Sequence, residues 1–240
     1  MLSHSFLAQR IQPARSSRQI PIGMLCDFAA VDWNRRHMDN SDQEWLMPFS
    51  ELRSVLSKQL AGLPSCTPLL ELGCGTSDLA ARLFDDGWRN VTSVDLSRAA
   101  VQQAHARFSG GRPGLMFALS DARRLDGFGS SEFGCVIDKG TLDAICCGEG
   151  FDYEGRLVLK SVERVLVPGG RWVCVSLMGP AVVMPMLDQA AWPYRHHERL
   201  GSSGLHLYQA RRHRRGHIRT RWFWQPVEGG WATRSAGALV

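Results

Sequence analysis

The 240-residue sequence contains no apolar run that approaches the ~20 residues a membrane-spanning helix needs, so we expect a chain that folds in water. Lysine is also scarce and stands only at positions 58, 139 and 160, so that arginine supplies most of the formal net charge of +5. Because an arginine bias reflects genome composition as much as function, this charge is weak evidence for a nucleic-acid partner. The hydrophobic share of 44% is that of an ordinary globular protein.

The seven cysteines form no CxxC pair and no cysteine–histidine pattern of the zinc type, so no metal site is predicted. Cys135 and Cys174 stand inside apolar runs, which indicates small core residues. Cys146 and Cys147 are adjacent, and adjacent cysteines form a disulfide only with strain. We therefore expect reduced, structural thiols, with a redox pair at 146 and 147 as the alternative.

Acidic residues are missing from the first 26 positions, where Arg10, Arg15 and Arg18 stand among several serines. That composition is typical of mitochondrial and plastid transit peptides. A disordered extension, or translation that starts at the in-frame Met24, explains it as well. We expect residues 1–27 to be an N-terminal extension of a cytoplasmic protein, with a mitochondrial or plastid location as the alternative.

Short apolar segments then alternate with amphipathic ones. Leu52, Val55, Leu56 and Leu60 recur at helical spacing and predict a helix after Ser50. Strands are predicted at 69–72, 91–96, 114–120, 132–138 and 171–177, and helices at 77–87, 99–108, 153–170 (ended by Pro168 and glycines) and 181–192. This alternation predicts βαβ units and a mostly parallel sheet.

Two further segments, 194–200 and 205–211, are predicted to pair as an antiparallel end of that sheet. The expected fold class is therefore α/β: a Rossmann-like, doubly wound, mostly parallel seven-stranded sheet with helices on both faces. The tail at 212–240 shows no clear period. Its basic residues and the aromatic group Trp222, Phe223 and Trp224 would suit stacking on RNA bases, although a solvated tail folded onto the domain is the commoner case.

Ligands of open α/β sheets bind outside the carboxyl ends of the strands, so the residues that follow each strand matter most. Gly73 and Gly75 allow a tight turn and a close approach of the backbone to a ligand. Asp95 ends the second strand, where an acid can accept hydrogen bonds from both ribose hydroxyls. Asp121 and Ala122 follow the third strand, where they could meet an adenine amine.

The charge around the glycine turn indicates which nucleoside cofactor binds. A dinucleotide site favours a third glycine beside the pyrophosphate, but Asp78 stands there, preceded by Thr76 and Ser77. An acid would repel a pyrophosphate. Glu71, just before the turn, suits a cationic ligand. The turn therefore favours S-adenosylmethionine, which carries a sulfonium, an ammonium and no phosphate, over NAD.

The segments LLELGCGTSDLA, NVTSVDLS, SDARRLD, VIDKGTLDAI and VERVLVPGGRWVCVSL resemble the successive motifs of the class I, seven-β-strand methyltransferases. DKGTLDA, together with the upstream EWLMPFSEL, resembles one branch of them: the lysine methyltransferases of elongation factor 1-alpha and their relatives, which include a citrate synthase methyltransferase. The likeness covers residues 28–211, which we expect to be the methyltransferase domain, and leaves 212–240 as a basic tail. Thr76 stands where many members have asparagine.

The resemblance implies S-adenosylmethionine as cofactor and a protein lysine as substrate, on a protein such as a translation elongation factor. It places Asp138 and Lys139 at the methyl-transfer site as catalytic residues. Cofactor-binding positions are expected at Trp45, Glu71, Gly73, Gly75, Ser77, Asp95, Leu96, Asp121, Ala122 and Asp138. Gly140, Thr141 and Leu142 are expected to line the substrate channel, with Thr141 capping the following turn.

Several alternatives stay open. Asp138 and Lys139 would form an exposed strand-end ion pair if they had only a structural role, and such a pair contributes little. A small-molecule methyltransferase is one alternative, and a non-catalytic partner that keeps the fold is another. The intact Gly73, Gly75, Asp95 and Asp138 argue against the last of these. Nucleic acid and membrane are not expected as partners.

Overall fold

The computed structural model describes residues 31–39, 44–147, 151–190 and 192–214, and the backbone of two strands at 222–227 and 230–235. The predicted extension at 1–27, and the side chains of the aromatic group in the tail, lie outside this description. No helix of the described part is long and apolar enough to cross a membrane.

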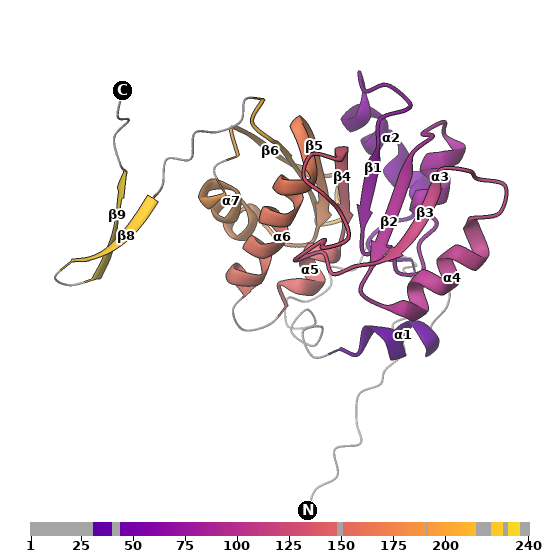
Figure 1. Ribbon diagram of the computed structural model, residues 1–240, viewed down its shortest axis with the longest axis horizontal. Coiled ribbons are helices and arrows are strands. Elements are labelled where there is room, and N and C mark those ends of the chain that lie inside the picture. The colour runs from indigo at the N-terminus through magenta and orange to yellow at the C-terminus, as the bar shows by residue number, and fades with distance from the viewer. Residues whose placement is uncertain are drawn as a thin grey trace, which may run out of the picture.

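A seven-stranded sheet forms the centre of the molecule, in the order β3-β2-β1-β4-β5-β7-β6 (Figure 1). Its strands are β1 (Leu69–Leu72), β2 (Val91–Asp95), β3 (Leu115–Leu119), β4 (Phe133–Lys139), β5 (Leu166–Ser176), β6 (Tyr194–Leu200) and β7 (Leu205–Arg211). The first five pair in parallel, whereas β7 runs antiparallel to both β5 and β6. The predicted fold class, including its antiparallel end, is confirmed.

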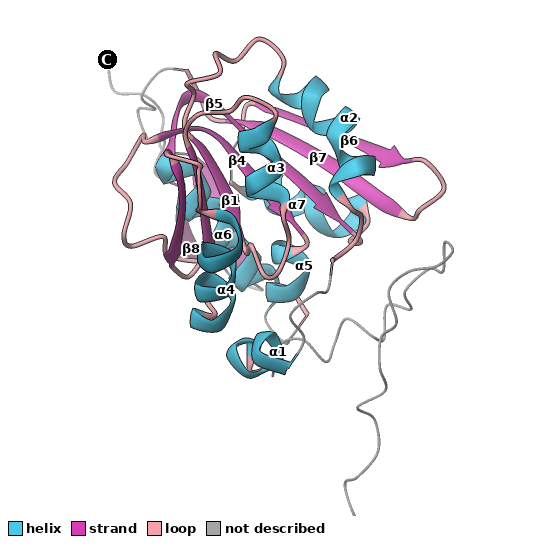
Figure 2. Ribbon diagram, turned by 90° about the vertical axis from the view of Figure 1, so that its right-hand side faces the viewer, coloured by secondary structure: helices cyan, strands magenta, loops and turns pink. Residues whose placement is uncertain are grey.

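Helices cover both faces of this sheet (Figure 2). They are α1 (Trp33–Asp39), α2 (Phe49–Leu60), α3 (Leu79–Asp85), α4 (Arg98–Phe108), α5 (Thr141–Ile145), α6 (Phe151–Val165) and α7 (Pro180–Gln189). Along β4 the side chains alternate between two cores: Ile137 packs in the core that contains Leu52 and Leu56 of α2, and Val136 in the core that contains Val158 of α6. A strand buried on both faces reads as a continuous apolar run, which is why β4 was recognisable from the sequence.

The strand order reverses beside β1, because the chain passes from β1 outward to β3 and then returns to β4 on the other side of β1. The carboxyl ends of β1 and β4 therefore flank the topological switch point, where open α/β sheets bind their ligands. Leu72 at the end of β1 pairs with Asp138 of β4, so the glycine turn and the DKGTLDA segment begin side by side.

The predicted end of the helix at 153–170 is wrong. Helix α6 ends at Val165, and Pro168 lies inside β5 instead of ending the helix. The backbone after Val165 forms hydrogen bonds with the residue that follows β7. The Gly169 N–H donates to the Arg212 carbonyl, and the Arg212 N–H donates to the Gly170 carbonyl. The tail without a clear period also contains a hairpin, β8 (Trp222–Val227) with β9 (Gly230–Ser235).

The predicted core cysteines lie in the core, since Cys135 and Cys174 are fully buried in the sheet. Cys146 and Cys147 are buried at the end of α5 and are not joined by a disulfide. Burial raises the pKa of the Cys146 thiol to about 12, which keeps it protonated at neutral pH.

Candidate active site

The turn after β1 has the close-packed geometry that its glycines predict. Gly73 and Gly75 adopt φ angles of +62° and +50°, in the left-handed region that favours glycine. A Cβ atom added at Gly73 would lie 2.1 Å from Oγ1 of Thr141, so no larger residue fits there. That Oγ1 donates a hydrogen bond to the Leu72 carbonyl at 2.7 Å, which fixes the turn against the segment after β4.

Asp95, at the end of β2, holds the other side of this turn. Its Oδ2 accepts a hydrogen bond from the Gly75 N–H at 2.8 Å, and its Oδ1 accepts one from the Ser97 N–H at 2.7 Å. Each carboxylate oxygen has two lone pairs, so both retain capacity to accept a ligand hydroxyl. Leu96, the next residue, leaves 56% of its surface exposed and offers an apolar contact beside the carboxylate.

Glu71 lies beneath the turn and is almost completely buried. The Ser93 hydroxyl donates to its Oε2 at 2.5 Å. Burial raises the pKa of Glu71 to about 7, because desolvation outweighs the hydrogen bond from Ser93 and the charge of Lys139, which both lower it. This carboxyl therefore changes charge near neutral pH instead of remaining a fixed anion.

Asp138 is fully buried at the end of β4. Its Oδ1 accepts hydrogen bonds from the N–H groups of Thr141 (2.9 Å) and Leu142 (3.2 Å), whereas its Oδ2 is buried without a hydrogen-bond partner among the described residues. Burial raises the pKa of Asp138 to about 7, the Leu142 N–H opposes that rise, and the nearby charge of Asp143 adds to it. A buried polar atom without a partner is costly, which marks Oδ2 as a group kept for a ligand or a proton.

The structure contradicts the alternative of an ion pair between Asp138 and Lys139, and it also contradicts the expected cap at Thr141. The Nζ of Lys139 donates to Oε1 of Glu44 at 2.5 Å and to the Trp45 carbonyl at 2.9 Å. Thr141 does not cap the following turn with its hydroxyl, because Asp138 accepts the N–H groups there. Asp138 points toward the turn and accepts its N–H groups, and Lys139 points away from Asp138 toward the N-terminal segment.

The Lys139 contact ties the N-terminal segment to the glycine turn. Glu44 uses its second carboxylate oxygen, Oε2, to accept a hydrogen bond from the Ser77 hydroxyl at 3.1 Å. The Lys139 side chain is only 6% exposed. Trp45, half-buried, lies beside it with its ring 5.0 Å from the guanidinium carbon of Arg36. Trp45, Ser77 and Lys139, which were all predicted as site residues, therefore come together in one cluster around Glu44.

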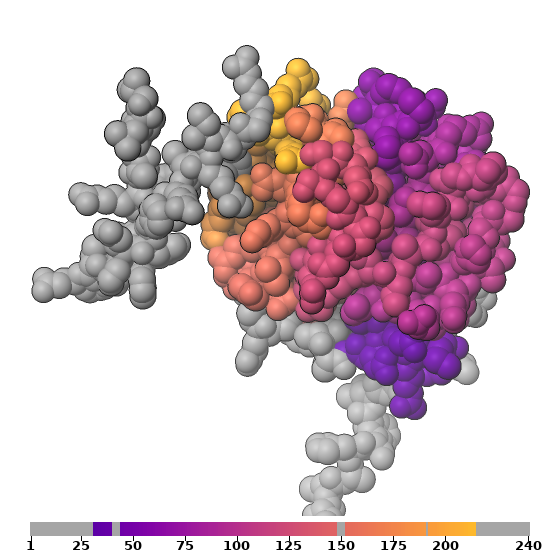
Figure 3. Space-filling view, in the orientation of Figure 1, coloured from indigo at the N-terminus to yellow at the C-terminus, as the bar shows by residue number. Residues whose placement is uncertain are grey.

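Helix α1 covers the same end of the sheet and was not predicted. Figure 1 shows it beneath α4, and Figure 3 shows its indigo surface against the magenta part of the chain. Asn34 accepts a hydrogen bond from the Ala99 N–H at 2.9 Å, and Gln103 donates to the His37 carbonyl at 2.9 Å. His37 is buried over the turn, where its Nε2 lies 3.4 Å from the position of a Cβ on Gly75.

Asp121 and Ala122 follow β3 as predicted. Arg123 binds the Asp121 carboxylate through Nε and Nη2, at distances down to 2.7 Å, and pairs through Nη1 with Glu154 of α6. This ion pair occupies both oxygens of Asp121 and makes it less open to a ligand than Asp95. Ala122 is buried, and its carbonyl accepts a hydrogen bond from Ser161.

Asp143 is a further buried acid, and it was not predicted as a site residue. Its Oδ1 accepts hydrogen bonds from the Ser176 hydroxyl (2.9 Å) and the N–H groups of Leu177 (2.8 Å) and Met178 (3.2 Å), just after β5. Burial raises the pKa of Asp143 to about 6, opposed by these hydrogen bonds. Asp143 thus joins the segment after β4 to the end of β5. Its place inside DKGTLDA was the signal for it.

The residues present fit a cationic nucleoside cofactor that carries no phosphate. Three buried acids stand at or next to the last residue of neighbouring strands: Glu71 on β1, Asp95 on β2 and Asp138 on β4. Asp138 also keeps one carboxylate oxygen without a hydrogen-bond partner among the described residues. Lys139, the cation nearest to them by sequence, is neutralised by Glu44. The donor set is therefore acidic, as S-adenosylmethionine requires, and the glycine turn provides the close backbone approach.

Comparisons with known proteins agree with this geometry. A family model described as a methyltransferase domain matches residues 69–170. The chain is 35% identical to EEF1A lysine methyltransferase 4 of Mus musculus, over 73% of this chain and 71% of that protein, and equally similar to the Bos taurus protein, over 76% and 75%. It is 34% identical to the eEF1A lysine and N-terminal methyltransferase of Danio rerio but spans only 25% of that longer protein.

Solved structures share the fold. An S-adenosylmethionine-dependent methyltransferase from Mesorhizobium loti is 15% identical with a TM-score of 0.55, and covers 68% of this chain and 98% of its own. The N-methyltransferase NodS from Bradyrhizobium japonicum, solved with S-adenosyl-L-homocysteine, is 19% identical with a TM-score of 0.53, over 80% and 97%. At such identities these likenesses show the fold alone.

Proposed function

Because the chain belongs to the S-adenosylmethionine-dependent methyltransferases, in the family of the EEF1A lysine methyltransferases, we propose that it methylates a lysine side chain of a translation elongation factor of the EF-1-alpha class. The observation that carries the proposal is the buried Asp138, whose Oδ2 has no partner within the described structure and lies at the carboxyl end of β4 beside the glycine turn. The EEF1A lysine methyltransferase names of two relatives support the choice of target.

The cofactor, when bound, would supply an electrophilic methyl group on its sulfonium, to which a neutral amine bonds at carbon while the thioether sulfur leaves. In this chain Gly73, Gly75 and Asp95 would hold the nucleoside end, and Asp138 would face the reacting end. Proximity and orientation account for most of the catalysis in such a displacement, so the main task of these residues is alignment. Glu71, beneath the turn, adds negative potential to the extent that it is ionised.

The substrate lysine must lose a proton before it reacts, because the reference pKa of a lysine is about 10.4. A partly desolvated site lowers that pKa. Asp138 has its own pKa raised to about 7, so it can accept a hydrogen bond or a proton from the amine near neutral pH. We assign Asp138 to orienting the amine through Oδ2.

Lys139 has a different role in this proposal. Its ammonium donates to Glu44 and to the Trp45 carbonyl, so we assign it to positioning the N-terminal segment and not to the chemistry. Gly140 and Thr141 are half-buried and keep their proposed place beside the substrate channel, whereas Leu142 is fully buried in the core that contains Val158 and supports the channel only from beneath. A small-molecule methyl acceptor is the second candidate for this site.

The proposal is tested by comparing methylated lysines in the proteomes of knockout and parent cells. We expect one or more lysines of the elongation factor to lose methylation in the knockout and to regain it when the parent gene is restored. Restoration with an Asp95→Ala variant should not suffice. An unchanged elongation factor, with methyl loss confined to a metabolite, would assign the site to the small-molecule alternative.

A further inference from the structure

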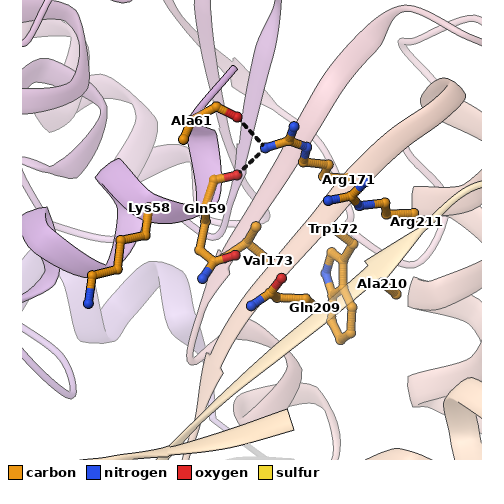
Figure 4. Close-up of a pocket in the computed structure, with 9 residues that line it drawn as sticks. All are labelled: Lys58, Gln59, Ala61, Arg171, Trp172, Val173, Gln209, Ala210 and Arg211. Carbon is orange, nitrogen blue, oxygen red and sulfur yellow. Dashed lines mark hydrogen bonds between the residues drawn. The ribbon is translucent and has the colours of Figure 1, made fainter. Parts of the chain in front are cut away.

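A cavity of about 290 Å³ lies at the amino end of the sheet, on the far side from the candidate active site (Figure 4). Arg171 of β5, which lines it, pairs in register with Cys135 near the start of β4, whereas Asp138 near the end of β4 pairs with Cys174. The polar side chains that line the cavity are Lys58, Gln59, Arg171, Gln209 and Arg211. Three of them are cations, and no carboxylate lines the cavity.

Two of these cations oppose each other across the sheet. Arg171 of β5 and Arg211 of β7 are direct antiparallel partners, and Figure 4 shows their guanidinium groups next to each other. Like charges directly opposite on paired strands destabilise a sheet. A negative charge close to both guanidinium groups would offset this repulsion.

Neither arginine obtains that charge from a carboxylate in the described part of the chain. Nη1 of Arg171 donates to the carbonyls of Gln59 (2.5 Å) and Ala61 (3.0 Å) at the end of α2 (Figure 4). Arg211 lies over the ring of Tyr194, with its guanidinium carbon 4.9 Å from the ring centroid. No salt bridge joins Arg171, Arg211 or Lys58 to an acid among the described residues.

The carbonyl contacts use Nη1 alone, so Nε and Nη2 of Arg171 have no hydrogen-bond partner among the described residues, and neither atom is buried. The Arg171 guanidinium is therefore held in place at one nitrogen and open at the others. A planar guanidinium fixed in this way presents parallel N–H groups, the geometry that binds phosphate through two hydrogen bonds. Gln209 of β7, two residues before Arg211, also lines the cavity and can add a neutral amide donor.

We propose that this cavity binds the phosphate group of a small phosphate monoester, at a site separate from methyl transfer. Arg171 and Arg211 would hold the phosphate, and Lys58 would add a third positive charge from α2. The cations line one small pocket that is open on one side instead of following a long groove, which favours a single phosphate head over a nucleic-acid backbone. A bound phosphate would also relieve the repulsion between the two arginines.

Isothermal titration calorimetry at constant ionic strength tests the proposal, with inorganic phosphate, glycerol 3-phosphate and a single-stranded oligonucleotide as probes. Arg211→Gln should weaken binding of both small probes at least fivefold. Arg89→Gln is the matched control, because Arg89 also lies over an aromatic ring, that of Phe84, at 5.3 Å, but outside the cavity. It should change the affinity less than twofold.

A second pair of variants removes a lysine without touching the strand packing. Lys58→Gln should weaken binding of inorganic phosphate at least twofold, whereas Lys160→Gln, on an exposed position of α6, should leave it unchanged. Methyl transfer should be unaffected by either lysine variant. The proposal is overturned if the parent binds neither small probe, if the control variants weaken binding as much as Arg211→Gln, or if the oligonucleotide binds more tightly than both small probes through Arg211.

Discussion

Replacing Asp138 with asparagine separates the structural from the chemical role of this carboxylate. An asparagine retains an Oδ1 that accepts the N–H groups of Thr141 and Leu142, so the turn after β4 should keep its shape. It loses the charge and the acceptor at Oδ2, which is the atom assigned to the amine. One lost charge-assisted contact of about 2.7 kcal/mol corresponds to roughly a hundredfold in rate. We expect methyl transfer at least tenfold slower and cofactor affinity within a few-fold of the parent.

The same substitution should also remove a pH-dependent cost in stability, so the variant should be more stable than the parent although it is slower in methyl transfer. The pKa of Asp138 is raised from 3.8 to about 7 in the folded state, so the folded protein binds more protons than the unfolded chain between these values. Asp138 therefore lowers the free energy of unfolding as the pH rises from about 4 to 7. At about 1.4 kcal/mol per tenfold change in proton affinity, the penalty approaches about 4 kcal/mol above pH 7. Asparagine does not titrate and should escape this penalty.

Single-turnover assays with saturating cofactor measure the first effect, and urea unfolding at pH 5 and pH 8 measures the second. Asp138→Asn should be more stable than the parent at pH 8 by a larger margin than at pH 5, and yet be slower in transfer. A variant with parent-like single-turnover rates would refute the assignment of Oδ2 to the amine. A stability difference that does not vary with pH would refute the raised pKa.

Three further substitutions probe the rest of the site. Asp95→Ala should weaken S-adenosylhomocysteine binding at least tenfold by calorimetry, since a hydrogen bond to a charged group contributes about 1.5–3 kcal/mol; unchanged affinity in the folded variant would remove the ribose role. Gly73→Ala should lower the thermal midpoint and abolish cofactor binding, because its Cβ would collide with Thr141; normal binding would contradict the close packing. Lys139→Met should raise the KM for the cofactor severalfold with kcat little changed, as it frees Glu44 and the N-terminal segment. If steady-state kinetics show a large fall in kcat instead, Lys139 belongs to the chemistry.

Local patterns predicted most of the sheet. The strands β1, β2 and β4 are buried on both faces, so their residues form apolar runs that are recognisable without knowledge of their neighbours. The hairpin of β6 and β7 was also correct. Pro168 misled the prediction, because it ends helices in general, whereas here the helix had already ended at Val165 and an irregular start of β5 accommodates the proline.

The site was predictable where its residues follow strands in sequence. Gly73, Gly75 and Asp95 follow this rule, and the structure joins Gly75 to Asp95 by a hydrogen bond. The partner of Lys139 was not predictable, since Glu44 lies 95 positions away and only the packing of the N-terminal segment brings it close. Helix α1 is short and has no apolar stripe, so its cover over the glycine turn came from the structure alone.

Mass spectrometry of a purified elongation factor 1-alpha, incubated with this protein and isotopically labelled S-adenosylmethionine, shows whether this protein methylates the elongation factor. We expect labelled methyl groups on a lysine side chain of the elongation factor with the parent protein, and at least a tenfold lower yield at equal time with Asp138→Asn. Label on no lysine, by a protein that binds S-adenosylhomocysteine and is fully folded, would contradict this expectation.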